Sequence, residues 1–243
     1  MMRRPTLQTA RSETRRSQAG VTLMELLFAM VILAVVTTML VGGWVALQRA
    51  SAHTVRTTTA RASARDALAR ISSELRACQP LTLGTAGETP FTVAWPMEVT
   101  FYSAYNHPGA NADGSGTGAL RPTRIWLDTS GSSPQKTLYW QRDMDSNGSF
   151  TDPGDRTIVL ARDVVNNSIS NTNVTPTASY TAIFTYGYRD ASGSFTTADT
   201  IASADLTRII SVQVRLIVDA NLSHTPTYVD LTTTLRPRNA DSD

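Results

Sequence analysis

A short acidic segment in the middle of the chain carries five side chains that could bind a hard metal ion. The segment DMDSNGSFTDPGD places Asp143, Asp145 and Asn147 at alternate positions, with a glycine sixth. Carboxylate and amide oxygens at this spacing around a tight turn suit the geometry of Ca²⁺. Asp152 and Asp155 follow and could complete the ligand set. A calcium loop with these five residues as ligands is therefore one of two interpretations of this segment.

The same segment also reads as an ordinary acidic turn. Its twelfth position is Gly154 and not the bidentate glutamate of a calcium loop, and no helical pattern flanks it. Asp, Asn and Gly are also the preferred turn residues. The alternative interpretation is a hairpin turn between a strand that ends at Arg142 and one that starts at Arg156.

The remaining reactive residue types suggest no catalytic site. Cys78 is the only cysteine, which excludes an intramolecular disulfide. His53, His107 and His224 lie in unrelated contexts without metal-ligand spacing. No Ser/His/Asp arrangement, paired-carboxylate signature or phosphate loop stands out. We therefore expect a protein that is not an enzyme.

The charge distribution separates the start of the chain from the rest. The first 20 residues hold five arginines and one glutamate, a net +4, so the remainder carries −2 of the overall +2. Lys136 is the only lysine, and the arginines of the body are scattered. This part of the chain has no basic patch of the kind that binds nucleic acid.

An apolar run without charge occupies residues 26–47. As a helix, 22 residues reach roughly 33 Å, and the hydrocarbon core of a bilayer is about 30 Å thick. Because arginines precede the run, the positive-inside rule predicts that residues 1–20 are cytoplasmic and that the rest of the chain is extracytoplasmic. Glu25 lies at the start of the run, where an unpaired carboxylate is costly in lipid. We therefore expect a partner that neutralises Glu25.

Three simpler interpretations of this run are a cleaved signal peptide, a signal anchor and the core helix of a soluble protein. The apolar part of a signal peptide is about 7 to 15 residues long and ends at a small-residue cleavage site. This run is longer and ends in GGWVALQ. A signal anchor, in turn, has no use for a carboxylate at Glu25.

The segment RSQAGVTLMELLFAM resembles the processing site of type IV prepilins and type II secretion pseudopilins. It has a basic leader, then Gly20, then an apolar helix whose fifth residue is Glu25. The resemblance implies cleavage after Gly20 by prepilin peptidase and N-methylation of the new first residue, Val21. The family most often has Phe at that position, so Val21 is a departure.

The resemblance also implies partners and a location. The expected partners are prepilin peptidase, other pilin-like subunits and an inner-membrane assembly platform. The expected location is the cytoplasmic membrane, crossed once, with the head in a cell-surface or periplasmic filament. We hypothesise that Glu25 of an incoming subunit pairs with the ammonium of Val21 on a neighbour, which turns a buried charge into a buried ion pair.

The chain divides by pattern into a leader (1–20), a membrane-spanning half-helix (21–47), an amphipathic half-helix (48–79) and a head (80–243). Residues 48–78 lack Pro and Gly and favour helix until Pro80. An apolar stripe at helical spacing predicts the face that packs on a sheet, and consists of Ala64, Leu68, Ile71, Leu75 and Cys78.

Charged residues of this half-helix, including Arg61, Arg65, Arg70, Glu74 and Arg76, lie off the stripe. We interpret the arginines of the half-helix as part of a solvated face. The alternative is that they contact neighbouring subunits or lipid headgroups.

Beyond Pro80 the apolar pattern alternates, which predicts a β-rich head. The fold class is therefore α+β, with a long helix packed on an antiparallel sheet. The predicted strands are 91–95, 97–105, 123–128, 136–142, 156–163, 180–189, 207–219 and 227–236.

The end of the chain, TYVDLTTTLRPRN after a long strand, is similar to that of J-type pseudopilins and W-type minor pilins. With the large head, this resemblance implies a minor pilin or pseudopilin that acts at filament initiation or at the tip. The alternative is an extracytoplasmic binding or enzymatic domain on a simple signal anchor.

Overall fold

The computed structural model describes residues 22–80, 88–104, 120–166, 180–219 and 228–237. The chain forms two compact units, residues 1–52 and 53–243. The first holds the amino-terminal part of a long helix, and the second holds the remainder of that helix and the sheet.

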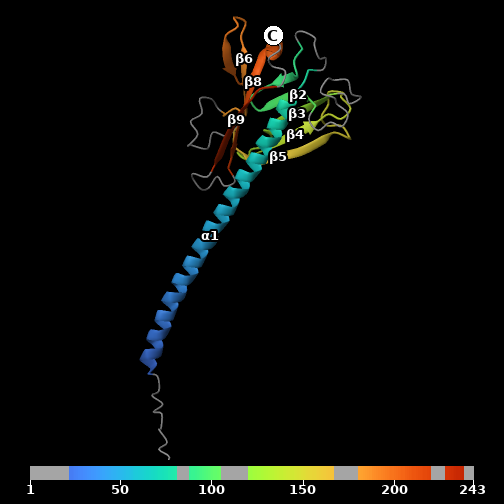
Figure 1. Cartoon of the computed structure of the whole chain (residues 1–243). Helices are drawn as coiled ribbons and strands as arrows, with labels where there is room; N and C mark the ends of the chain where they lie inside the picture. The colour runs from blue at the N-terminus through green and yellow to red at the C-terminus, as the bar shows by residue number, and fades with distance from the viewer. Residues whose placement is uncertain (1–21, 81–87, 105–119, 167–179, 220–227, 238–243) are drawn as a thin grey trace, which may run out of the picture. The chain divides into compact units, whose positions relative to one another are not determined.

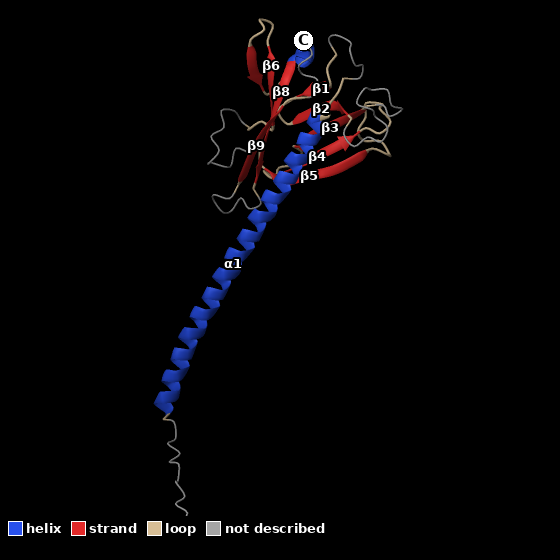
Figure 2. Cartoon of the chain, in the orientation of Figure 1, coloured by secondary structure: helices blue, strands red, loops and turns tan. Residues whose placement is uncertain are grey.

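The described residues form one α-helix and an antiparallel sheet, which confirms the α+β fold class (Figure 2). The elements in chain order are α1 (Leu23–Arg76), β1 (Phe91–Ala94), β2 (Glu98–Ser103), β3 (Arg121–Asp128), β4 (Lys136–Arg142), β5 (Arg156–Val164), β6 (Phe184–Arg189), β7 (Phe195–Ala198), the 3₁₀ helix η1 (Ser203–Arg208), β8 (Ile209–Val218) and β9 (Val229–Leu235).

The strands form a single sheet in the order β1-β2-β3-β4-β5-β8-β6-β7, with β9 paired to β8 (Figure 1). The strands β1 to β5 form a simple meander of antiparallel neighbours. The join between β5 and β8 is narrow, because only Val164 and Val218 are paired there. The sheet therefore consists of two halves that meet at one end of β5.

A buried asparagine reinforces this narrow join. The Asn166 side chain donates to the carbonyl oxygens of Arg215, at 2.9 Å, and Thr181, at 3.3 Å. Its own oxygen accepts a hydrogen bond of 2.8 Å from the backbone N–H of Ile217. The side chain thus satisfies backbone groups that a neighbouring strand would otherwise satisfy.

Each of the eight predicted strands overlaps an observed one, but two details differ. The strand predicted from residue 180 begins at Phe184, because the N–H of Ile183 donates to the carbonyl of Pro96 instead of to β8. The short strand β7 was not predicted. It pairs with β6 across the turn at Asp190–Ser194, where Asp190 accepts hydrogen bonds from the backbone N–H groups of Ser192 and Ser194.

In the second unit, α1 lays a face of small and branched residues on the sheet. The predicted stripe is confirmed within α1: Ala64, Ile71 and Leu75 are buried, and Leu68 packs partly buried against the same core. Cys78 is also buried, but it lies beyond the end of the helix, where it forms a β-bridge with Ser103. The structure adds Ala60 and Ala67 to this face. Across from it the core contains large side chains of the sheet, among them Phe91, Phe101, Ile125, Leu138 and Trp140.

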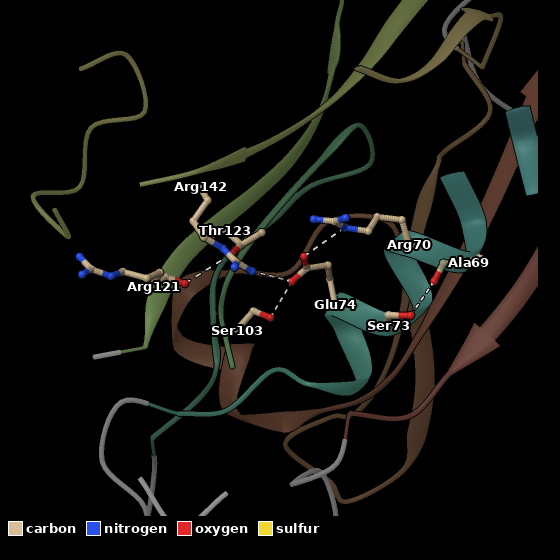
Figure 3. Close-up of polar contacts among 8 residues, drawn as sticks. All are labelled: Ala69, Arg70, Ser73, Glu74, Ser103, Arg121, Thr123 and Arg142. Carbon is tan, nitrogen blue, oxygen red and sulfur yellow. Dashed lines mark hydrogen bonds and ion pairs between the residues drawn. The ribbon is translucent and has the colours of Figure 1, made fainter. Parts of the chain in front are cut away.

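Glu74 lies off the apolar stripe, as expected, but it is buried. Its carboxylate is fully inaccessible and accepts hydrogen bonds from Ser103 Oγ, at 2.7 Å, and Arg142 Nη2, at 2.9 Å. Arg70 Nε lies 3.4 Å from the other carboxylate oxygen. Figure 3 shows these three groups converging on Glu74. Its buried position is tolerated because β4 supplies the compensating charge.

The two arginines of this cluster also flank one aromatic ring. The guanidinium carbons of Arg70 and Arg142 lie 4.8 Å and 4.9 Å from the ring centroid of Trp140. Arg142 Nε also donates to Thr123 Oγ1 at 3.3 Å. Burial lowers the pKa of Arg142, and the adjacent Glu74 carboxylate opposes that effect. The cluster thus ties α1 to three strands of the sheet.

The other arginines of the half-helix agree with the predicted solvated face. Arg61, Arg65 and Arg76 are exposed, whereas Arg70 is only partly exposed because it lies over Trp140.

Candidate assembly site at the amino terminus

Thr22 and Glu25 form a reciprocal cap at the start of α1. The backbone N–H of Glu25 donates to Thr22 Oγ1 at 3.2 Å, and the backbone N–H of Thr22 donates to Glu25 Oε2 at 2.9 Å. The Thr22 hydroxyl also lies 3.1 Å from Oε2 and donates to it. This is the capping box, in which two otherwise unpaired N–H groups of the first turn are satisfied by side chains.

The position of Glu25 in the first turn of α1 also stabilises the helix start. A carboxylate in the first turn interacts favourably with the positive end of the helix dipole. Within the described residues, both hydrogen bonds to this carboxylate reach Oε2. The T-x-x-E spacing of residues 22 to 25 is itself a capping signal, and the sequence analysis missed it.

The predicted processing residues precede this cap. Gly20 and Val21 lie outside the described residues, so cleavage between them and methylation of Val21 stay predictions. Val21 is bonded directly to Thr22, so any charge on its amino group would be one residue away from the cap.

The apolar segment that follows is helical and exposed throughout. All residues from Thr22 to Ala52 are exposed within the chain. The helix contains a window with a mean hydropathy of 2.5 and is long and apolar enough to cross a membrane, as judged by length and composition. The expected helix is confirmed, and it runs without interruption past Gly42 and Gly43.

Two polar side chains in the apolar segment are satisfied within the helix. The hydroxyls of Thr37 and Thr38 donate to the carbonyls of Leu33 and Ala34, each at 2.7 Å. Such bonds to the preceding turn remove the cost of exposing a hydroxyl to lipid. With these hydroxyls satisfied, the remaining unfavourable group for lipid is Glu25, the one charged side chain of the described residues 22–48.

The predicted calcium loop is a turn that joins β4 to β5, and it brings its five polar residues together. One oxygen from each of Asp143, Asp145 and Asp155 lies within 4.8 Å of the other two. Asn147 Nδ2 donates to Asp145 Oδ2 at 3.0 Å and to Asp152 Oδ2 at 2.7 Å. The expected hairpin turn from Arg142 to Arg156 is confirmed in position.

Backbone N–H groups donate to the carboxylates of this loop. Asp143 accepts from the N–H groups of Ser146, at 2.6 Å, and Gly148, at 2.8 Å. Asp155 accepts from Met144 at 3.0 Å. The hydrogen bond with Asp143 raises the pKa of Asp145, because it favours the protonated form of one of two adjacent carboxylates. The oxygen donors suit Ca²⁺, but the turn also satisfies itself, so the calcium site stays a prediction.

The comparison with known proteins addresses the amino terminus. The prokaryotic N-terminal methylation motif matches residues 15–41, a range that includes Gly20, Val21, Thr22 and Glu25. The comparison with curated proteins found no match to the chain. The motif implies processing by prepilin peptidase, association with a membrane and pilin-like assembly. Together, the motif and the long apolar helix that begins at the Thr22–Glu25 cap support a type IV pilin-like subunit, a structural component anchored in a membrane.

Proposed function

We propose that this protein is a minor pilin or pseudopilin that assembles through α1 into a type IV pilus-like or type II secretion filament. The observation that carries the proposal is Glu25, a carboxylate at the capped start of an apolar helix, five residues after Gly20. In this arrangement the leader is cytoplasmic, the chain crosses the inner membrane once, and the head is extracytoplasmic.

The Glu25 carboxylate supplies the assembly chemistry. In a single subunit its charge is partly compensated by the Thr22 hydrogen bonds and the helix dipole, but it remains an anion in lipid. The ammonium of Val21 on a neighbouring subunit neutralises it. Because leaving either charge buried alone costs about 3–5 kcal/mol, the pair selects one axial register between adjacent helices.

The size of the head favours a position at initiation or at the tip. The chain continues for 163 residues after Pro80. A bulky head fits the end of a filament more easily than a closely repeated shaft. The long paired strands β8 and β9 agree with the strand pattern on which the resemblance to J-type pseudopilins and W-type minor pilins rests.

The mature amino terminus tests this proposal. Mass spectrometry of the protein from its native host is compared with the protein from a prepilin-peptidase deletion. We expect N-methylated Val21 as the first residue, with the leader retained in the deletion strain and in a Gly20→Ala variant. An intact leader in the unaltered host would contradict the proposal and indicate a domain on a signal anchor. Cleavage near Ala46 would contradict it as well and indicate a secreted domain.

A further inference from the structure

Among the residues that the structure describes, the outer edge of β5 has no partner strand along most of its length. On one side β5 pairs with β4 from Arg156 to Val164. On the other side, only Val164 is paired, with Val218 of β8. Figure 1 shows β5 at the margin of its half of the sheet. Among the described residues, no strand covers residues 156–162 on this side, which leaves backbone groups of the edge available for pairing.

A groove of about 500 Å³ runs beside this edge, between β5 and the part of α1 that belongs to the same unit. Its lining is largely apolar and includes Val55, Ala60, Val159, Leu160, Ala161 and Val218. Beside it, Ile158 and Val159 are 36% and 39% exposed. The groove can therefore accept apolar side chains of a segment that lies along the edge.

The rim of the groove is mainly cationic. Arg56 of α1 and Arg162 of β5 line it, and Arg156 begins the same strand. All three are exposed, and within the described residues none forms an ion pair. Asp163 is the one carboxylate of the lining. The two exposed arginines of the lining outnumber its one aspartate, which suits a partner that carries carboxylates.

We propose that the open edge of β5 and its groove bind an extended, acidic segment of a neighbouring subunit, which adds a strand to the sheet. Backbone hydrogen bonds to the edge would give affinity, and alternate side chains of the added strand would enter the groove. Carboxylates of the same segment would meet Arg56, Arg156 and Arg162. This inference rests on the proposed function, because it takes the partner to be another filament subunit.

A second copy of this chain is a poorer occupant than a different, acidic subunit. Two β5 edges paired antiparallel about Val159 would place Arg156 opposite Arg162 twice. Like charges directly opposite each other in a sheet are destabilising. In this register the arginines discourage self-association through the edge, and they favour a partner of opposite charge.

Peptide binding to the full chain in detergent micelles tests the chemistry of the edge. The first probe is a peptide of alternating Val and Glu with a proline at each end, and the second has Lys in place of Glu. Amide hydrogen exchange is measured by mass spectrometry. We expect the Glu peptide to slow exchange over residues 156–162 and the Lys peptide to have no effect.

Charge reversal on the rim gives the decisive comparison. Arg56→Glu with Arg162→Glu should weaken binding of the Glu peptide by about tenfold or more and allow the Lys peptide to bind. Arg65→Glu is the matched control, because Arg65 is exposed on α1 and does not line the groove. Equal binding of both peptides, or equal losses in the two charge variants, would overturn the proposal.

Photocrosslinking in the native host identifies the partner. A photoreactive residue at position 159 should form an adduct with an Asp- or Glu-bearing segment of another pilin-like subunit, and the Arg56→Glu/Arg162→Glu variant should lose it. An adduct with a second copy, or none at all in a subunit that is processed at Val21, overturns this inference alone. An unprocessed subunit instead points to failure of the proposed function.

Discussion

The carboxylate of Glu74 on α1 and the guanidinium of Arg142 on β4 are 2.9 Å apart, and their side chains are 0% and 7% exposed. These residues are separated by 68 positions in the chain. Without Arg142, Glu74 would retain only the interaction with the more exposed Arg70, and without Glu74 the buried Arg142 would lose its carboxylate partner. The pair therefore stabilises the arrangement in which this turn of the helix lies over β4. The register of α1 on the sheet is therefore specified by charge as well as by apolar contacts.

Removing one member of this pair should be far more harmful than removing both. We expect Glu74→Leu or Arg142→Met alone to lower the free energy of unfolding by about 3–5 kcal/mol, because a charge is left buried. The double variant should recover much of this loss. Urea unfolding of the three variants in micelles, followed by tryptophan fluorescence, measures the coupling.

The control for this prediction is an exposed ion pair of similar geometry. Arg215 Nη2 lies 2.6 Å from Asp230 Oδ2, with the two side chains 41% and 28% exposed. Arg215→Met should cost less than about 1 kcal/mol. Similar losses at Arg142 and Arg215 would show that burial adds nothing to the Glu74 pair.

Charge and capping at the amino terminus can be separated by two substitutions. Glu25→Gln keeps an oxygen that accepts the Thr22 N–H but removes the charge, whereas Thr22→Ala keeps the charge and removes the hydroxyl. We expect Glu25→Gln to reduce incorporation into filaments by more than about tenfold, since the ion pair is lost. Thr22→Ala should assemble, with a helix start weakened by about 1 kcal/mol.

The measurement is the fraction of mature subunit in sheared filaments, normalised to processed subunit in the membrane. Normal incorporation of Glu25→Gln would remove the ion-pair assignment. Equal defects in both variants would instead identify the cap as the feature that assembly requires.

The predicted calcium loop is tested by calorimetric titration of the full chain in micelles with Ca²⁺. Asp145→Ala should abolish the heat of binding if the loop holds an ion, because Asp145 is one of the three clustered carboxylates. Asp190→Ala is the matched control, since Asp190 also organises a hairpin turn through backbone N–H groups. Absence of heat from the unaltered chain would leave the segment as an acidic turn.

Cys78 should resist thiol reagents in the folded protein. It is fully buried, and burial raises the pKa of its thiol to about 12. The folded chain therefore retains a proton that the unfolded chain releases above about pH 9. Stability from this group is constant below pH 9 and falls as the pH rises toward 12.

Labelling with a chromogenic disulfide reagent at pH 8 checks this prediction. We expect no reaction in native conditions and one thiol per chain in urea. Rapid labelling of the native chain would mean that the junction of α1 with the sheet opens readily.

The regular elements were accessible from the sequence because their patterns are local. Residues 64 to 78 repeat at helical spacing, and the alternation in β8 identifies an inward face that includes Val212, Val214 and Leu216. The partnership of Glu74 with Arg142 and the bridging by Asn166 depend on residues far apart in the chain. No periodicity predicts such contacts.

The candidate sites also divide into those that depend on local sequence and those that depend on contacts between distant residues. The five polar residues of the acidic loop lie within a single turn, so their convergence was predictable from spacing alone. The Thr22–Glu25 cap is equally local, because the T-x-x-E spacing is itself a capping signal. The open edge of β5 could not be predicted, because it depends on which strand fails to pair beside it.

The cap on α1 also bears on the entropy of assembly. If cleavage occurs after Gly20, a single residue separates the new ammonium from Thr22, whose backbone N–H is already held by Glu25. The charge that a neighbouring subunit must find would then be tethered to the helix end by one peptide unit. Ordering one residue costs about 1–2 kcal/mol, much less than the gain from pairing a charge in lipid. The cap would thus hold the ammonium of Val21 close to the position that it occupies in the contact, so little further entropy would be lost on assembly.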